Sequence, residues 1–97
     1  MATAGARIGF LGAGKMASAL AKGWLSAGLA SADRLSASDP LPAARDSFGK
    51  ETGAFVSAKN SEIAQRSDVL VLAVKPQHMT ALLTEVQAAV KIGRAHV

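Results

Sequence analysis

The sequence predicts an α/β fold in which helices alternate with the strands of a parallel sheet. Short apolar segments bounded by Gly or Pro alternate along the 97 residues with segments whose apolar residues recur every three or four positions. Residues 68–74, Asp-Val-Leu-Val-Leu-Ala-Val, are apolar after the first position and typical of a strand buried on both faces. A glycine-rich turn separates the first strand from the first helix. These features predict the order βαβαβαβα with right-handed crossovers.

The predicted strands are bounded by residues that interrupt regular structure. Gly12 follows the first strand, Asp39 and Pro40 follow the second, and Pro76 follows the fourth, while Gly53 precedes the third. The predicted strands are residues 7–11, 34–38, 54–56 and 68–74.

The predicted helices show apolar residues at helical spacing or residues typical of helix ends. Met16, Leu20 and Trp24 fall four positions apart on one face of the first helix, and Gly28 closes it. Asn60 is typical of a helix start, because its side chain accepts hydrogen bonds from free N–H groups. The predicted helices are residues 15–27, 41–48, 62–65 and 79–90.

The turn after the first strand has the spacing of a dinucleotide-binding loop. Residues 12–17, Gly-Ala-Gly-Lys-Met-Ala, fit the pattern G-x-G-x-x-A between a strand and a helix. Gly12 permits the tight turn, Gly14 lets the backbone approach a pyrophosphate, and Ala17 lets the helix pack closely on the strand. The start of the helix offers unpaired N–H groups and partial positive charge to that anion. The sequence therefore predicts a Rossmann-like nucleotide site; a glycine-rich turn without a ligand is the alternative.

The end of the second strand bears on the choice between NAD and NADP. An acid at Asp39 would bind both hydroxyls of an adenosine ribose and repel a 2′-phosphate, which favours NAD. Ser38, Lys59 and Asn60 would favour the phosphate instead. The choice stays open, and a plain turn-starting role before Pro40 is the alternative for Asp39.

The end of the fourth strand is a second candidate part of the site. Ligands of doubly wound sheets lie at the carboxyl ends of the strands, where Ala73, Val74, Lys75 and Pro76 are expected. Lys75 would face the ribose or phosphate of the cofactor. The alternative is a strand ended by a surface lysine and a proline.

Composition and charge exclude several classes of site. The net charge is +4, but the basic residues are scattered and form no run or helical stripe, so no nucleic-acid partner is expected. The absence of cysteine and the presence of only two histidines exclude disulfides and metal clusters of these residues. No apolar run approaches the roughly 20 residues that span a bilayer, so no membrane partner is expected.

Four strands make only the first part of a doubly wound sheet. In the order 3-2-1-4-5-6 the fourth strand would be an apolar open edge, which is an aggregation liability. We therefore expect an incomplete doubly wound fold, with residues 1–91 as the truncated dinucleotide-binding domain of a longer protein. Residues 92–97, Ile-Gly-Arg-Ala-His-Val, match the in-frame translation of a common sequencing-adapter DNA and are expected to be a non-native tail. An ordinary exposed helix end is the alternative.

Three segments resemble the N-terminal domain of pyrroline-5-carboxylate reductase. They are residues 8–17, 20–24 and 67–76, and the resemblance covers roughly residues 7–90. The pairing of Gly-x-Gly-x-Met with Ala-Val-Lys-Pro at this separation carries the resemblance. It implies an NADPH- or NADH-dependent cytoplasmic enzyme that reduces 1-pyrroline-5-carboxylate to L-proline.

The resemblance also implies roles for individual residues. Asp39 and Asn60 would contact the adenosine ribose or its 2′-phosphate, although many members carry a small hydroxyl residue where Asp39 stands. The pyrophosphate would be held by Leu11, Gly12, Ala13, Gly14, Lys15 and Met16. The path to the nicotinamide would be lined by Ala73, Val74, Lys75 and Pro76.

The resemblance further implies what lies outside this chain. The substrate pocket and the helices that form the homo-oligomer would belong to a C-terminal helical domain, so no catalytic residue is assigned here. We expect the chain alone to bind the cofactor weakly and to show no turnover. Two rivals remain: the N-terminal domain of a hydroxyisobutyrate-type β-hydroxyacid dehydrogenase, and a non-enzymatic nucleotide-sensing module.

Overall fold

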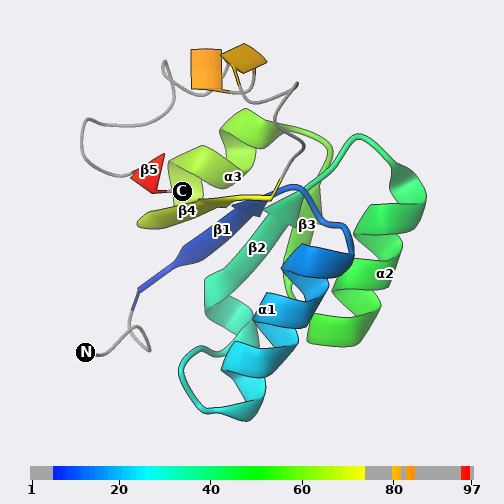
Figure 1. Cartoon of the computed structure of the whole chain (residues 1–97), viewed down its shortest axis with the longest axis vertical. Coiled ribbons are helices and arrows are strands. Elements are labelled where there is room, and N and C mark those ends of the chain that lie inside the picture. Colours follow the sequence, from blue (N-terminus) through cyan, green and yellow to red (C-terminus); the bar gives the residue numbers. More distant parts are fainter. Residues whose placement is uncertain (1–5, 74–79, 82, 85–94, 97) are drawn as a thin grey trace.

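The computed structural model describes residues 6–73, 80, 81, 83, 84, 95 and 96. Its elements alternate between strands and helices, as expected (Figure 1). The strands are β1 (Ile8–Leu11), β2 (Leu35–Ser38), β3 (Phe55–Ser57), β4 (Val69–Leu72) and β5 (Ala95–His96). The helices are α1 (Lys15–Ser26), α2 (Pro42–Thr52) and α3 (Asn60–Arg66), with a 3-10 turn at Ala32–Arg34.

The sheet has the order β3-β2-β1-β4-β5, and all its pairs are parallel. Strand β1 lies in the middle, where Ile8 pairs with Leu35 of β2 and with Val69 of β4. The predicted order of the first four strands is confirmed. Because β1 is hydrogen-bonded on both sides and covered on both faces, all four of its residues are buried.

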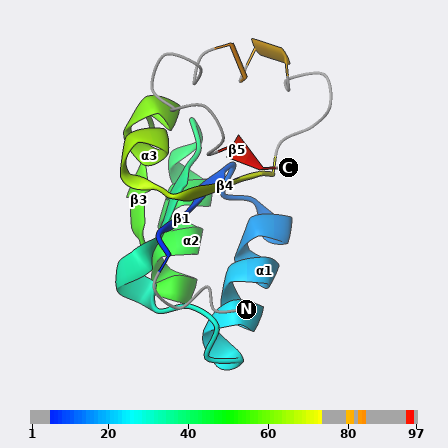
Figure 2. The same ribbon diagram turned by 90° about the vertical axis from the view of Figure 1, so that its left-hand side faces the viewer.

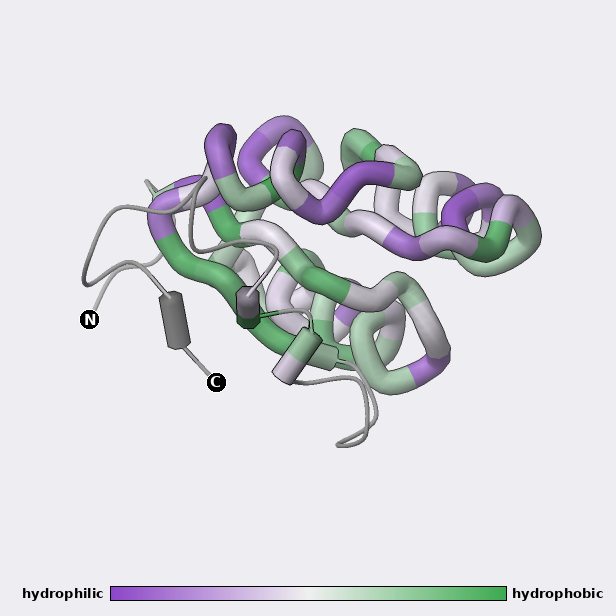
Figure 3. The backbone as a smooth tube through the Cα atoms, turned by 90° about the horizontal axis from the view of Figure 1, so that it is seen from above, coloured by the Kyte–Doolittle hydropathy of each residue, from purple (hydrophilic) through white to green (hydrophobic). Residues whose placement is uncertain are grey.

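Helices cover both faces of the sheet (Figure 2). Phe10 of β1 packs against Trp24 of α1 and Phe48 of α2, with ring centroids 5.6 and 5.7 Å apart. Gly9 precedes Phe10 and therefore faces the opposite side, where Ile63 of α3 lies fully buried. The helices in Figure 3 alternate between hydrophilic and hydrophobic segments, as expected of helices with one face on a sheet.

The helix bounds differ most from the predicted ones in α2 and α3. Helix α2 continues past Phe48 to Thr52 and ends where Gly53 adopts a left-handed φ of 74°. Gly49 lies inside the helix, and a Cβ there would meet Val56 of β3 only at the ordinary contact distance of 3.9 Å. Helix α3 runs from Asn60 to Arg66 rather than over residues 62–65.

The strand bounds also differ. Strand β2 begins one residue late, because Arg34 belongs to the 3-10 turn. Strand β4 begins at Val69, since Asp68 lies before the strand and donates its N–H to Arg7 O, and it ends at Leu72 rather than residue 74. In the predicted last helix, the described residues Thr80, Ala81, Leu83 and Thr84 are helical, and the others lie outside the described residues.

The expected open edge at β4 is wrong. The structure pairs β4 with the two-residue β5, with Leu70 opposite Ala95 and Val71 opposite His96. Two residues of the predicted non-native tail thus cover half the length of β4, because the edge of an apolar strand is a template for any extended segment. Over the described residues, no helix has the length and apolarity needed to cross a membrane.

Candidate functional site

The glycine loop (residues 12–14) carries the chain from β1 into α1. Gly12 has a φ of 114°, a region that side chains disfavour, and its N–H donates to Ser38 O at 2.7 Å. Ala13 is buried, whereas Gly14 is exposed. The loop therefore turns sharply against the end of β2 and presents Gly14 to solvent.

The start of α1 has no capping side chain. Gly14 is its N-cap, and the first helical hydrogen bond runs from Ser18 N–H to Gly14 O at 3.0 Å. The N–H groups of Lys15, Met16 and Ala17 consequently have no acceptor within the helix. The first turn holds no acidic residue, and Lys15 adds a positive charge. This helix start has the donors and the electrostatic potential to hold an anion.

Space in front of this helix start is open. A Cβ placed on Gly14 would meet no protein atom within 4 Å. The fold therefore does not need glycine at this position for its own packing. Close approach by a ligand gives a physical reason for the missing side chain.

Asp39 connects the glycine loop to the turn between β2 and α2. Its Oδ2 accepts from Ala13 N–H and its Oδ1 from Leu41 N–H, both at 3.0 Å. Arg45 donates from Nη1 to Asp39 O at 2.8 Å and to Pro40 O at 3.2 Å. The bond to Leu41 agrees with a turn-starting role. The bond to Ala13 spans 26 positions, and local sequence patterns gave no indication of it.

These bonds do not consume the acceptor capacity of Asp39. Each carboxylate oxygen accepts one described hydrogen bond and has a further lone pair for a ribose hydroxyl. The carboxylate is half-buried beside the loop. The predicted ribose contact is therefore compatible with the structural role and stays a prediction.

Asn60 lies at the same edge of the sheet, at the start of α3. Its Oδ1 accepts from Ser38 Oγ at 2.5 Å, and Ser38 itself is fully buried. Asp39 N–H donates to Ser57 O at 3.1 Å, which holds the ends of β2 and β3 together. The structure thus brings Asn60 and Asp39 to the carboxyl ends of neighbouring strands, as predicted.

The remaining predicted residues differ in exposure. The side chain of Leu11 is fully buried, so only its main chain faces the loop edge, while Met16 is 66% exposed. Ala73 donates its N–H to Leu11 O at 2.9 Å and therefore lies beside the glycine loop. Val74, Lys75 and Pro76 lie outside the described residues.

A groove that the sequence did not indicate opens beside the loop between α1 and α2. It has a volume of about 530 Å³ and runs from Gly14 past Ser18 to Lys22 and Glu51. Lys22 Nζ and Glu51 Oε1 lie 3.0 Å apart. The hydrogen bonds from Lys22 and then from Ser47 hold the pKa of Glu51 below its ordinary value. The acid and the nearest base of the groove therefore neutralise each other.

Among the described residues, no group of three His, Asp or Glu side chains is placed to hold a metal ion.

Comparison with known proteins gives several relatives named pyrroline-5-carboxylate reductase. Pyrroline-5-carboxylate reductase of Methanosarcina acetivorans is 40% identical over 81 residues, which cover 84% of this chain and 30% of that protein. Among solved structures, pyrroline-5-carboxylate reductase of Coxiella burnetii matches with a TM-score of 0.80 and 28% identity, over 86% of this chain and 30% of that chain. The Plasmodium falciparum pyrroline carboxylate reductase with NADP bound matches with a TM-score of 0.73 and 29% identity, over 88% and 30%.

These relatives confirm the resemblance found in the residues. The chain spans about 30% of the length of the proteins it matches. A family model described as NADP oxidoreductase, coenzyme F420-dependent, matches residues 7–93, which is most of the chain. With the parallel sheet and the glycine loop in place, the chain belongs to this family of NADP oxidoreductases.

Proposed function

We propose that residues 1–91 form the cofactor-binding domain of an NAD(P)H-dependent pyrroline-5-carboxylate reductase. The observation that carries the proposal is the start of α1: an uncapped helix end, with open space at Gly14 and no acid in the first turn. Relatives named for this reductase support the substrate class. Residues 92–97 are proposed to be a non-native tail.

The residues of the glycine loop fit a dinucleotide pyrophosphate. N–H groups at the start of α1 would donate to its oxygens, and the exposed Lys15 would add positive charge. Gly12 sets the turn, and Asp39 holds Ala13 in place through its N–H. The proposed role of the loop is to bind and orient the pyrophosphate, and the loop takes no part in the bonds that form or break.

The adenosine end of the cofactor would lie at Asp39 and Asn60. The carboxylate of Asp39 favours a ribose with two free hydroxyls, while the exposed Lys59 favours a 2′-phosphate. Ser38 was also expected to favour the phosphate, but its hydroxyl is buried and donates to Asn60. NADP and NAD therefore both remain proposed cofactors. Their relative affinity depends on the charge at Asp39.

The proposed reaction is hydride transfer from the nicotinamide to the imine carbon of 1-pyrroline-5-carboxylate, for which the cofactor supplies the hydride. The residues of this chain bind and orient. Ala73, Val74, Lys75 and Pro76 are proposed to line the path toward the nicotinamide. The substrate pocket, the proton donor and the contacts of a homo-oligomer are proposed to lie in a helical domain outside this chain, in a cytoplasmic enzyme.

The first experiment measures cofactor binding by the chain itself. Calorimetric titrations with NADPH and NADH should give weak, saturable binding, and Gly14→Asp should weaken it by about tenfold or more, because a carboxylate takes the place of the anion. Gly23→Asp is the matched control, since a Cβ at Gly23, on the same helix, also meets nothing within 4 Å. Equal affinity of the two variants would refute the loop assignment.

The second experiment tests the reaction. Residues 1–91 are joined to the C-terminal part of the Methanosarcina acetivorans relative, and NADPH consumption is followed with 1-pyrroline-5-carboxylate. The chimera should form proline, its Gly14→Asp form should not, and the 97-residue chain alone should show no turnover. A folded chimera that binds NADPH but forms no proline would contradict the proposed role in this reaction.

A further inference from the structure

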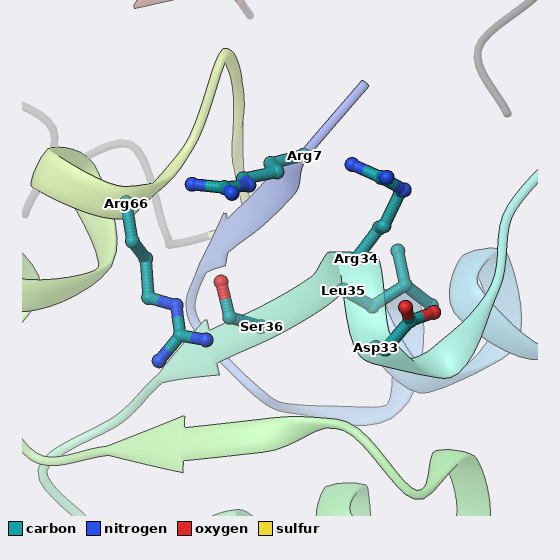
Figure 4. A pocket seen from close by; sticks show the side chains of 6 residues that line it. All are labelled: Arg7, Asp33, Arg34, Leu35, Ser36 and Arg66. Carbon is teal, nitrogen blue, oxygen red and sulfur yellow. The ribbon is translucent and has the colours of Figure 1, made fainter. Parts of the chain in front are cut away.

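A second pocket lies at the opposite end of the strands from the glycine loop. It has a volume of about 220 Å³ and is lined by Arg7, Asp33, Arg34, Leu35, Ser36 and Arg66. Figure 4 shows that these residues come from three places: the entry to β1, the junction of the 3-10 turn with β2, and the end of α3. Three guanidinium groups against one carboxylate make the pocket strongly positive.

Ser36 places a polar group inside this pocket. It pairs with Gly9, so its side chain faces the same side of the sheet as α3. Ser36 is only 3% exposed, and its hydroxyl points to the side of β2 where Arg7 and Arg66 lie (Figure 4). Within the described residues, this hydroxyl forms no hydrogen bond. A hydroxyl directed into a positive pocket adds a hydrogen-bond donor for an anion that enters the pocket.

The two flanking arginines are held in place without being neutralised. The main chain of Arg7 accepts from Asp68 N–H at 2.7 Å and donates to Asp68 Oδ2 at 3.0 Å. Arg66 stacks on Phe55, with its guanidinium carbon 4.0 Å from the ring centroid. In the part of the chain that the structure describes, neither guanidinium lies within ion-pair distance of a carboxylate.

The acid of the pocket, Asp33, belongs to the 3-10 turn before β2. A hydrogen bond from Ser31 lowers the pKa of Asp33 more than any other contact, while the charge of Arg34 has a smaller effect. Asp33 is the single carboxylate of the lining against three guanidinium groups, so the pocket keeps an excess of positive charge.

We propose that Arg7, Arg66 and Ser36, with the added charge of Arg34, form a binding site for a phosphate-type dianion. Guanidinium groups bind the oxygens of such ions through paired N–H donors, and the hydroxyl of Ser36 supplies one more donor. The volume is smaller than the roughly 300–1,000 Å³ of pockets that enclose whole drug-sized ligands. The site therefore accepts inorganic phosphate or the terminal phosphate of a small metabolite.

This site is independent of the proposed cofactor site, since the two lie at opposite ends of β1. Phosphate also suits the glycine loop, so the experiment must show where the ion binds. Inorganic phosphate is titrated into the ¹⁵N-labelled chain at constant ionic strength, with chloride as the balancing anion. The amide signals of Ser36 and Arg66 should shift saturably, and should do so equally in the Gly14→Asp variant.

Variants separate specific binding from general attraction of anions. Arg66→Gln should weaken phosphate binding by about tenfold, and Ser36→Ala by roughly threefold. Lys50→Gln removes the same charge from an exposed position on α2 and should leave the affinity unchanged. Inorganic phosphate and a phosphate monoester such as glycerol 3-phosphate, compared in separate titrations, identify the source that binds more tightly.

Three results would overturn the proposal. They are shifts confined to residues 12–17, shifts that chloride reproduces at equal ionic strength, and a loss of affinity in Lys50→Gln as large as in Arg66→Gln.

Discussion

Two glycines five positions apart, Gly9 in β1 and Gly14 after it, serve opposite purposes. A Cβ on Gly9 would lie 2.6 Å from Ile63 Cγ2 and closer still to Ser67 Oγ. A Cβ on Gly14 would meet nothing within 4 Å. The first glycine is required for the internal packing of α3, and the second leaves space outside the fold. The same residue type therefore serves core packing before Gly12 and leaves open space after it, at the proposed ligand site.

The largest effect on stability is expected at Gly9. Gly9→Ala should lower the free energy of unfolding by about 2–3 kcal/mol, because α3 must move away from β1 to admit the methyl group. Urea unfolding followed by circular dichroism measures the change. The comparison fails if Gly9→Ala is no less stable than Gly14→Ala, whose methyl group has free space.

A smaller loss is expected at Gly12, which lies between the two. Gly12→Ala should lower the free energy of unfolding by about 1–2 kcal/mol, because a φ of 114° is strained for a residue with a side chain. The same substitution should also weaken NADPH binding by displacing Gly14. Stability and affinity that both stay unchanged would show that the turn tolerates a side chain.

Asp39 combines a structural role with a proposed ligand contact, because it links the glycine loop to the turn after β2. Asp39→Ser should lower the free energy of unfolding by about 1 kcal/mol, since Ala13 N–H and Leu41 N–H lose their acceptors. It should also shift the ratio of NADPH to NADH affinity toward NADPH by about tenfold. Calorimetric titration with both cofactors measures the ratio.

Asp46→Ser is the control for that experiment. It removes the same charge from an exposed position on α2 and should change neither quantity. A shift in cofactor preference as large as that of Asp39→Ser would mean that net charge alone sets the preference.

The smallest effect is expected at Glu51, in the groove beside the loop. Because its pKa is lowered in the folded chain, its contribution to stability is present above the ordinary pKa of 4.5 and is lost as the pH falls through the lowered value. Glu51→Gln should therefore be slightly less stable than the unsubstituted chain at pH 7, and the gap should close in acid. Thermal melts across this pH range test it, and a gap that widens in acid would contradict it.

Local pattern was sufficient to predict most of the strands and the loop. The buried segment before Gly12 and the apolar run after Asp68 each identify a strand within a few residues. The first helix was predicted to end at residue 27 and ends at Ser26. These features depend on neighbours in the sequence, which the periodicity of side chains records.

Contacts between residues that are far apart in the sequence could not be predicted from local patterns. The bond from Ala13 N–H to Asp39 joins residues 26 positions apart, and the arginines around Ser36 come from segments separated by up to 59 positions. The second helix was predicted to end at Phe48, whereas α2 continues to Thr52. The pairing of β5 with β4 likewise depends on an edge that exists only in the folded sheet.

The sequence by itself determined the alternation of strands and helices, the order of the first four strands and the position of the glycine loop. Each of these follows from the spacing of apolar residues and from glycine at a turn that side chains disfavour. Three features depend on the tertiary structure. Gly9 leaves room for the packing of α3, Asp39 hydrogen-bonds the glycine loop, and a positive pocket forms around Ser36. The physical reason is that packing, hydrogen bonding and charge act between atoms that folding brings together, whatever their separation along the chain.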